Sequence, residues 1–220
     1  MRFLGYYKYI IKRFISQSII KFKFRLKKNY LARNCTVSKD LILGGNNKIG
    51  FMSIIGENVR MEENSKVGDF ANISNIQIGR NSILDSKVVC TGYGKGNIVI
   101  GEESYIGINN ILDFSNNIKI GNHVHIAGPS TGVWTHTSYN VCLKGLSVGY
   151  KDEEFHPTAP ITIENNVYIG GNCTIYPGVT IHHHSVIAPN SAVTKDVAPY
   201  TMVGGVPAKI IKQIDKNKYE

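Results

Sequence analysis

The chain has 220 residues, of which 42% are hydrophobic, enough for one sizeable domain with a buried core. Its formal net charge of +9 comes from residues 1–34, which hold ten Lys or Arg and no acid, since residues 35–220 hold 15 basic and 16 acidic residues. The sequence contains no long apolar run and no small-residue cleavage site after its first residues, so we expect neither a spanning helix nor a secretory signal.

Residues 1–34 combine this basic charge with aromatic and aliphatic residues spaced for one or two amphipathic helices. Such a basic leader suits peripheral contact with the anionic inner membrane. It would equally suit a cap over the open end of a repeat structure. Nucleic-acid binding is not expected, because no recognised motif accompanies the charge.

A six-residue repeat follows the leader. Aliphatic residues recur at positions 49, 55, 61, 67 and 73, and again without a slip from 163 to 193. A small or apolar residue stands four places after each of them except position 73. A hexapeptide period predicts an all-β solenoid, a parallel β-helix whose coils hold about 18 residues. Gly, Asn and Asp are expected at the corners, where positive φ is tolerated.

Several segments interrupt the repeat. Residues 90–97 are glycine-rich and predict a flexible bulge, and the phase slips at Asn116-Asn117. The repeat is expected to stop after Thr131 and to resume at Ile161, so residues 132–160 predict a protruding functional loop. We divide the chain into a helical leader (1–34), a β-helix domain (35–200) and a C-terminal tail (201–220) with a short helix from Ala208 to Lys216.

The four cysteines, Cys35, Cys90, Cys142 and Cys173, have neither metal-binding nor redox spacing. They predict reduced thiols in a cytoplasmic protein.

The C-terminal half resembles the hexapeptide-repeat acyltransferases, and is most similar to the branch that O-acetylates sugars and polysaccharides. The resemblance is carried by Asn-Val-Tyr-Ile-Gly-Gly at 166–171, Pro-Gly-Val-Thr-Ile at 177–181, Thr-Lys-Asp at 194–196 and Gly-Gly-Val-Pro-Ala-Lys at 204–209. It implies a left-handed β-helix, a homotrimer, and acetyl-CoA bound in a groove between neighbouring chains.

The resemblance also implies roles for particular residues. Gly170, Gly171 and Ala188 would let the cofactor approach the backbone, although a corner that needs positive φ explains the two glycines almost as well. Lys195 and Lys209 would lie near the phosphates, and Pro207 against the adenine. The cofactor-binding set is Gly170, Gly171, Ala188, Thr194, Lys195, Gly205, Pro207 and Lys209.

Of the seven histidines, His136 matches the position of the family's catalytic base, where the repeat gives way to the long loop. The resemblance implies direct transfer, with His136 taking the proton of an acceptor hydroxyl. Expected acceptor contacts are Asn109, Asp113, Trp134 and Tyr168. Asp113 could instead orient His136, and Asn109 or Asp113 could merely cap a corner.

We expect no metal. His182, His183 and His184 are consecutive on a tight corner and should diverge, whereas His123 and His125 leave open a zinc-dependent lyase of the carbonic anhydrase type. A non-catalytic scaffold is a further alternative. The sequence favours O-acetylation of a sugar in a bacterial surface glycan, capsule or lipopolysaccharide. N-acetylation of a nucleotide-linked amino sugar and acetylation of a xenobiotic are the rivals.

Overall fold

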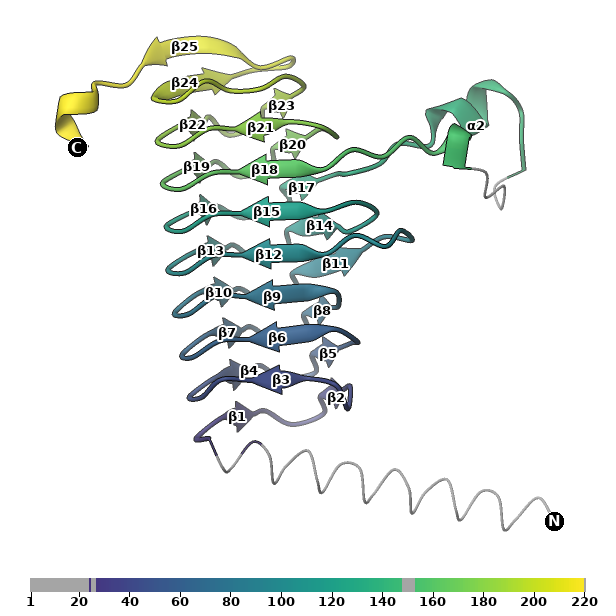
Figure 1. The fold of residues 1–220 in the computed structure, drawn as a ribbon, viewed down its shortest axis with the longest axis vertical. Coiled ribbons are helices and arrows are strands. Elements are labelled where there is room, and N and C mark those ends of the chain that lie inside the picture. Colours follow the sequence, from purple (N-terminus) through teal and green to yellow (C-terminus); the bar gives the residue numbers. More distant parts are fainter. Residues whose placement is uncertain (1–23, 25–26, 148–152, 220) are drawn as a thin grey trace.

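The protein is a parallel β-solenoid in which short strands stack coil upon coil (Figure 1). The computed structural model describes residues 24, 27–147 and 153–219. Most of the predicted leader helix therefore lies outside the described residues. Within the described part, β1 (Tyr30–Leu31) already pairs with the next coil, so the repeat begins before residue 35.

Strands from every third position form three sheets, one for each side of the coil. The first sheet contains β1, β4 (Lys48–Ile49), β7 (Lys66–Val67), β10 (Ile83–Leu84), β13 (Tyr105–Ile106), β16 (His125–Ile126), β19 (Tyr168–Ile169), β22 (Val186–Ile187), β24 (Thr201–Gly204) and β25 (Lys209–Gln213). The second contains β2 (Thr36–Val37), β5 (Ile54–Ile55), β8 (Asn72–Ile73), β11 (Val89–Thr91), β14 (Ile111–Asp113), β17 (Gly132–Val133), β20 (Thr174–Ile175) and β23 (Ala192–Val193). The third contains β3 (Ile42–Leu43), β6 (Val59–Met61), β9 (Ile76–Ile78), β12 (Ile98–Ile100), β15 (Ile118–Ile120), β18 (Ile161–Ile163) and β21 (Thr180–Ile181).

The core consists of the aliphatic residues that define the repeat. In the second sheet, Leu112 is paired with Val133 and Val133 with Ile175, and all three side chains are fully buried. Most residues four places after an aliphatic are also buried, including Ser53, Ser65 and Cys173. The hexapeptide period therefore predicted the inward-facing residues correctly.

Three kinds of corner join the sheets, and we number them in chain order. The first corner leads from the first sheet to the second, the second corner from the second sheet to the third, and the third corner back to the first sheet. Asparagine is the commonest residue with positive φ at these corners. It has this conformation at Asn34, Asn46, Asn58, Asn64, Asn75, Asn81, Asn109, Asn166, Asn172 and Asn190.

Most corner glycines have a different role from the one predicted. Gly68 does not have positive φ, but a Cβ there would lie 2.5 Å from the backbone nitrogen of Ser86 in the next coil. Glycine is needed at such positions because neighbouring coils approach too closely for a side chain. No corner aspartate has positive φ among the described residues.

The long excursion starts later than predicted. Gly132 and Val133 form β17, which pairs on both sides, so the chain leaves the coil only after Val133. The excursion contains α2 (Tyr139–Leu143) and the 3₁₀ helix η1 (Glu153–Phe155), and it rejoins the stack at β18. Figure 1 shows it projecting from the stack between β17 and β18. No helix in the described part of the chain is long and apolar enough to cross a membrane.

The predicted helix from Ala208 to Lys216 is wrong. Residues 209–213 form β25, which pairs antiparallel with β24, and only the 3₁₀ turn η2 (Lys216–Lys218) follows. Gly205, with φ of +97°, turns the chain back on itself. The returning segment pairs with backbone groups that β24 would otherwise leave exposed at the end of the sheet.

We expect Gly68→Ala to lower stability by about 1–3 kcal/mol, because the new methyl group would push two coils apart. A thermal melt should show a midpoint several degrees below that of the wild type. Gly45→Ala is the matched control, because its Cβ would lie 3.5 Å from the carbonyl oxygen of Lys27, an ordinary contact. Equal melting temperatures of the two variants would show that the spacing between coils does not require glycine at position 68.

Candidate active site

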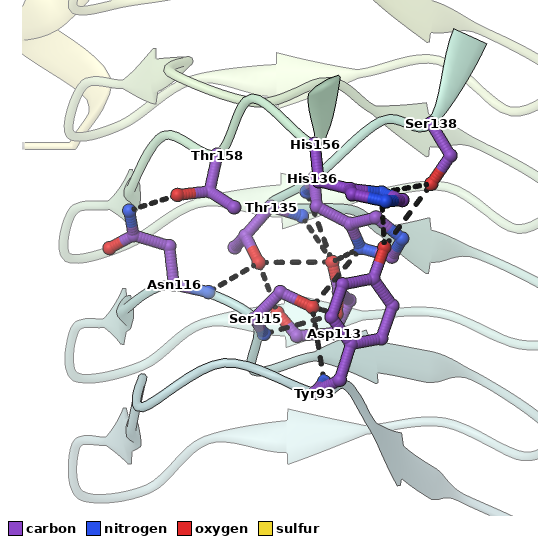
Figure 2. A network of polar contacts seen from close by, with 9 residues as sticks. All are labelled: Tyr93, Asp113, Ser115, Asn116, Thr135, His136, Ser138, His156 and Thr158. Carbon is purple, nitrogen blue, oxygen red and sulfur yellow. Dashed lines mark hydrogen bonds and ion pairs between the residues drawn. The ribbon is translucent and has the colours of Figure 1, made fainter. Parts of the chain in front are cut away.

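A histidine and a buried carboxylate meet where the excursion leaves the second corner. His136 Nδ1 lies 2.6 Å from Asp113 Oδ2. The Asp113 side chain is fully buried, whereas the His136 side chain is 17% exposed. The pair therefore joins the interior of the solenoid to its surface, with the imidazole on the accessible side (Figure 2).

Asp113 accepts hydrogen bonds at both of its carboxylate oxygens. Oδ1 accepts from the Ser115 hydroxyl at 2.7 Å and the Ser115 backbone N–H at 3.1 Å. Oδ2 accepts from the backbone N–H groups of Thr135, at 2.8 Å, and His136, at 3.1 Å. Burial would raise the pKa of Asp113, but the hydrogen bonds from His136 and Ser115 outweigh burial, so the pKa of this carboxyl lies below its ordinary value.

The register of the coils brings these residues together. Leu112 is paired with Val133, so the residues that follow in the two coils run side by side. Thr135 is buried, and its hydroxyl lies 2.7 Å from the Asp113 carbonyl oxygen and 2.9 Å from the Asn116 backbone nitrogen. These bonds fix the backbone just before His136.

The two ends of the excursion are tied to each other. His136 forms an antiparallel bridge with Thr158, and the Ala159 N–H donates to the Thr135 carbonyl at 2.9 Å. The side chain of Asn116 donates to the Thr158 hydroxyl at 3.0 Å. His136 therefore lies on an ordered segment although it is outside the repeat.

Tyr93, Ser138 and His156 surround the exposed side of the pair. The Tyr93 ring lies edge-on to His136, with centroids 4.7 Å apart. The Tyr93 hydroxyl is 3.2 Å from Ser138 Oγ, which is 3.1 Å from His156 Nδ1 (Figure 2). Tyr93 comes from the bulge after β11, and the other two residues come from opposite ends of the excursion.

The predicted acceptor residues occupy different places. Asp113 is fully buried and bonded to His136, so it orients the histidine instead of contacting a substrate. Trp134 is half-buried beside His136 in sequence, and its indole covers Gly132. Asn109 is exposed at the first corner, at the opposite end of β14 from Asp113, and its side chain donates to the Ser130 hydroxyl at 3.0 Å.

Tyr168 lies on the first sheet, also away from His136. Its ring is 42% exposed and lies 5.4 Å from that of His125, which in turn lies 4.8 Å from the ring of Tyr105. Within one chain, Asn109 and Tyr168 are therefore not brought to the histidine.

The predicted cofactor residues lie at four places in the fold. Gly170, Gly171 and Ala188 lie at the first corner, and Gly205 and Pro207 lie in the turn after β24. Thr194 and Lys195 are exposed at the second corner, on the same edge of the solenoid as His136, and Lys209 is exposed on β25.

Close packing explains the glycines at the first corner. Neither Gly170 nor Gly171 has positive φ, so a corner that needs positive φ does not explain either glycine. A Cβ on Gly170 would lie 2.5 Å from the Pro189 backbone nitrogen, and one on Gly171 would lie 2.6 Å from the Gly128 carbonyl oxygen. The next coil is therefore the reason for glycine at position 170, and the preceding coil is the reason at position 171.

The consecutive histidines diverge only in part, because His183 Nδ1 lies 3.0 Å from His184 Nδ1, while His182 turns away. His182 Nδ1 lies 3.2 Å from Glu164, whereas His184 stacks on Tyr200 with centroids 4.7 Å apart. They are half-buried rather than fully exposed. Among the described residues, no three His, Cys, Asp or Glu side chains gather closely enough to hold a metal ion.

Sequence reasoning missed Tyr93, Ser115, Thr135, Ser138 and His156. The repeat register contained a signal for two of them, Ser115 and Thr135. Once Leu112 is aligned with Val133, counting three residues forward in each coil places Ser115 beside His136, and Thr135 follows two residues after Val133. Tyr93, Ser138 and His156 lie on inserted segments, where the repeat gives no register.

Comparisons with known proteins agree with this fold. Residues 160–195 match the family model described as "Bacterial transferase hexapeptide (six repeats)". The chain is 36% identical over 146 residues to the galactoside O-acetyltransferase of Escherichia coli, a match covering 64% of this chain and 66% of the relative. Its structure is similar to that of AntD, an N-acyltransferase from Bacillus cereus crystallised with dTDP and 3-hydroxybutyryl-CoA, with a TM-score of 0.58, 21% identity and coverage of 76% and 86%.

A crystal structure of a hexapeptide-repeat acetyltransferase from Vibrio cholerae gives a TM-score of 0.51 at 34% identity, covering 63% of this chain and 73% of that protein. The repeat, the register of its core and these matches lead to one conclusion: the chain belongs to the hexapeptide-repeat transferase family.

Proposed function

We propose that the protein is an O-acetyltransferase that moves an acetyl group from acetyl-CoA to a sugar hydroxyl. The observation that carries this proposal is the contact of 2.6 Å between His136 and the buried Asp113. A histidine held by a carboxylate, at an accessible edge of the fold, is the arrangement that a general base requires.

The hydrogen bonds of His136 favour Nε2 as the nitrogen that takes the proton. Asp113 Oδ2 accepts a hydrogen bond from the Nδ1–H group of His136, which leaves the lone pair on Nε2. No described residue makes a hydrogen bond to Nε2. Nε2 is therefore the atom that would take the proton of an acceptor hydroxyl, while the Asp113 carboxylate stabilises the imidazolium that forms.

The transfer is direct. As Nε2 takes the proton, the hydroxyl oxygen attacks the carbonyl carbon of the acetyl thioester. The carbon–sulfur bond then breaks, and CoA leaves as a thiolate that can receive the same proton from His136. The products are the acetyl ester and CoA, and His136 is again neutral.

A trimer would complete the donor site. The proposed backbone contacts at Gly170, Gly171 and Ala188 lie at the first corner, whereas His136 and Lys195 lie at the second. One chain presents these corners on different edges of a three-sided stack. In a homotrimer the first corner of one chain would face the second corner of its neighbour, and an extended acetyl-CoA would lie between them, its phosphates near Lys195 and Lys209.

The relative from Escherichia coli is named as acting on galactosides, which supports a sugar hydroxyl as acceptor. We place this acceptor in a bacterial surface glycan. The basic residues 1–34 suit work by a cytoplasmic enzyme at the inner surface of the membrane where such glycans are built.

We expect His136→Ala to lower kcat by about 10²–10⁴, because proton removal from the hydroxyl would lose its base. Turnover is measured as release of CoA thiol with acetyl-CoA and a panel of hydroxylated and amino sugars. CoA affinity should stay unchanged, and His182→Ala, which alters a histidine at the third corner, is the control. Wild-type turnover in His136→Ala would remove this residue from the mechanism. Preference for amino sugars would make the enzyme an N-acetyltransferase.

We expect Asp113→Asn to lower kcat by about a hundredfold or more, because an amide NH₂ group on either side would face backbone N–H donors and misplace His136. The variant should also be less stable. The low pKa of Asp113 means that its stabilising effect is present above the ordinary aspartate pKa and is lost as the pH falls through its lowered pKa.

The difference in melting temperature between the wild type and Asp113→Asn should therefore become smaller as the pH drops below about 4. A difference that stays constant down to the lowest pH at which the protein is folded would contradict the role of the ionised carboxylate.

We expect calorimetric titration to show about one CoA site per chain, and sedimentation to show a trimer. Lys195→Ala and Lys209→Ala should each weaken CoA binding about two- to tenfold, with less effect at high salt, since each removes a charge near phosphate. Lys119→Ala, on the third sheet, is the matched control. A monomer that binds CoA normally would refute the shared groove.

A further inference from the structure

The bulge between β11 and β12 is packed firmly against the neighbouring coil. Its sequence alternates Gly92, Tyr93, Gly94, Lys95 and Gly96. A Cβ on Gly92 would lie 2.7 Å from the backbone nitrogen of Ser115, and side chains on Gly94 and Gly96 would collide with the backbone of residues 115 and 116. The predicted bulge therefore exists, and its glycines allow it to pack closely against the segment that follows Asp113.

This packing directs the Tyr93 side chain towards His136 and His156. Its ring lies between two histidines, with centroids 4.7 Å from His136 and 5.8 Å from His156, and both contacts are edge-on. Tyr93 is nevertheless 64% exposed. An exposed tyrosine is normally free to change rotamer, but this one is held while much of its surface stays open to a ligand.

The Tyr93 hydroxyl joins the two ends of the excursion. It lies 3.2 Å from Ser138 Oγ and 3.5 Å from His156 Nδ1. Ser138 occupies the N-cap position of α2, yet its side chain makes no capping hydrogen bond. A serine in that position usually stabilises its helix by about 1 kcal/mol. Here its hydroxyl bonds to Tyr93 and His156 instead.

We propose that Tyr93, Ser138 and His156 form the acceptor-binding wall of the active site, and that Tyr93 is also the positioning residue that fastens the excursion beside His136. This inference rests on the proposed acetyltransferase function. It adds the residues that select the acceptor and the contact that holds the excursion.

The chemistry of the wall suits a hydroxylated ring. The carbon-bound hydrogens on one face of a sugar can pack against an aromatic ring such as Tyr93. The bonds within the cluster leave acceptor lone pairs on the oxygens of Tyr93 and Ser138, which can receive a sugar O–H. A hydroxyl of the same ring would then lie near His136, whose ring is in contact with Tyr93.

The test compares Tyr93→Phe, Tyr93→Ala and Ser138→Ala with Tyr219→Ala, which alters another exposed tyrosine of similar exposure, 63%, near the C-terminal end. Three quantities are measured on the full chain. They are transfer to methyl β-D-galactopyranoside and to N-acetylglucosamine, hydrolysis of acetyl-CoA without acceptor, and amide exchange in residues 134–147 and 153–160.

Tyr93→Phe and Ser138→Ala should raise the acceptor KM about three- to tenfold and accelerate amide exchange in the excursion slightly, because each removes hydrogen bonds of the cluster. Hydrolysis and CoA affinity should stay close to wild type. Tyr93→Ala should raise the acceptor KM further, lower kcat about tenfold and accelerate exchange in both segments of the excursion. Tyr219→Ala should match the wild type in all three quantities.

Unchanged acceptor KM and unchanged exchange in Tyr93→Ala would overturn the inference. Failure of the proposed function looks different, because the wild type itself would then not bind CoA. If the wild type binds CoA but accepts neither sugar, amide exchange in the excursion becomes the test. Equal exchange rates in Tyr93→Ala and Tyr219→Ala would then refute the proposal that Tyr93 fastens the excursion.

Discussion

Every other feature of this protein depends on the register between coils. Each inward aliphatic side chain stacks on its counterpart one coil away, as Leu112, Val133 and Ile175 do at the centre of the second sheet. A shift of one residue would turn the buried side chains of that strand outward. Burial therefore fixes the register, and the register fixes where every outward-facing side chain and every corner lies.

The site uses this rigidity. The carboxylate of Asp113 is held by backbone N–H groups from its own coil and from the next, so the register between the coils fixes its position beside His136. Three departures from the repeat meet at the same corner: the bulge at 92–97, the turn after Asp113, and the excursion that starts after Val133. The regular stack supplies the positions, and the insertions supply the groups that surround the histidine.

The corners divide two tasks between two residue types. Asparagine takes up the left-handed conformation, as at Asn64 and Asn172, and glycine allows the next coil to approach, as at Gly68 and Gly170. The division is not complete, because Met52 and Phe70 have positive φ with exposed apolar side chains, and Gly205 has positive φ as well. Positive φ also occurs at Lys28, Lys87, Glu103, His123, Ser130, His184 and Tyr200. Only the spatial neighbours of a glycine distinguish the two tasks, so a glycine in the sequence alone is ambiguous.

The sequence by itself determined the solenoid and its inward residues, because a six-residue period is a local property of the chain. Its resemblance to the hexapeptide-repeat acyltransferases, and not the period, pointed to His136, whose catalytic role stays a proposal. The tertiary structure decided the rest. Asp113 orients His136 because of pairing between coils, residues 209–213 form a strand because β24 offers an unpaired edge, and Tyr93 reaches the histidine from a bulge that carries no repeat. Each of these depends on contacts between residues far apart in the chain, which no local pattern encodes.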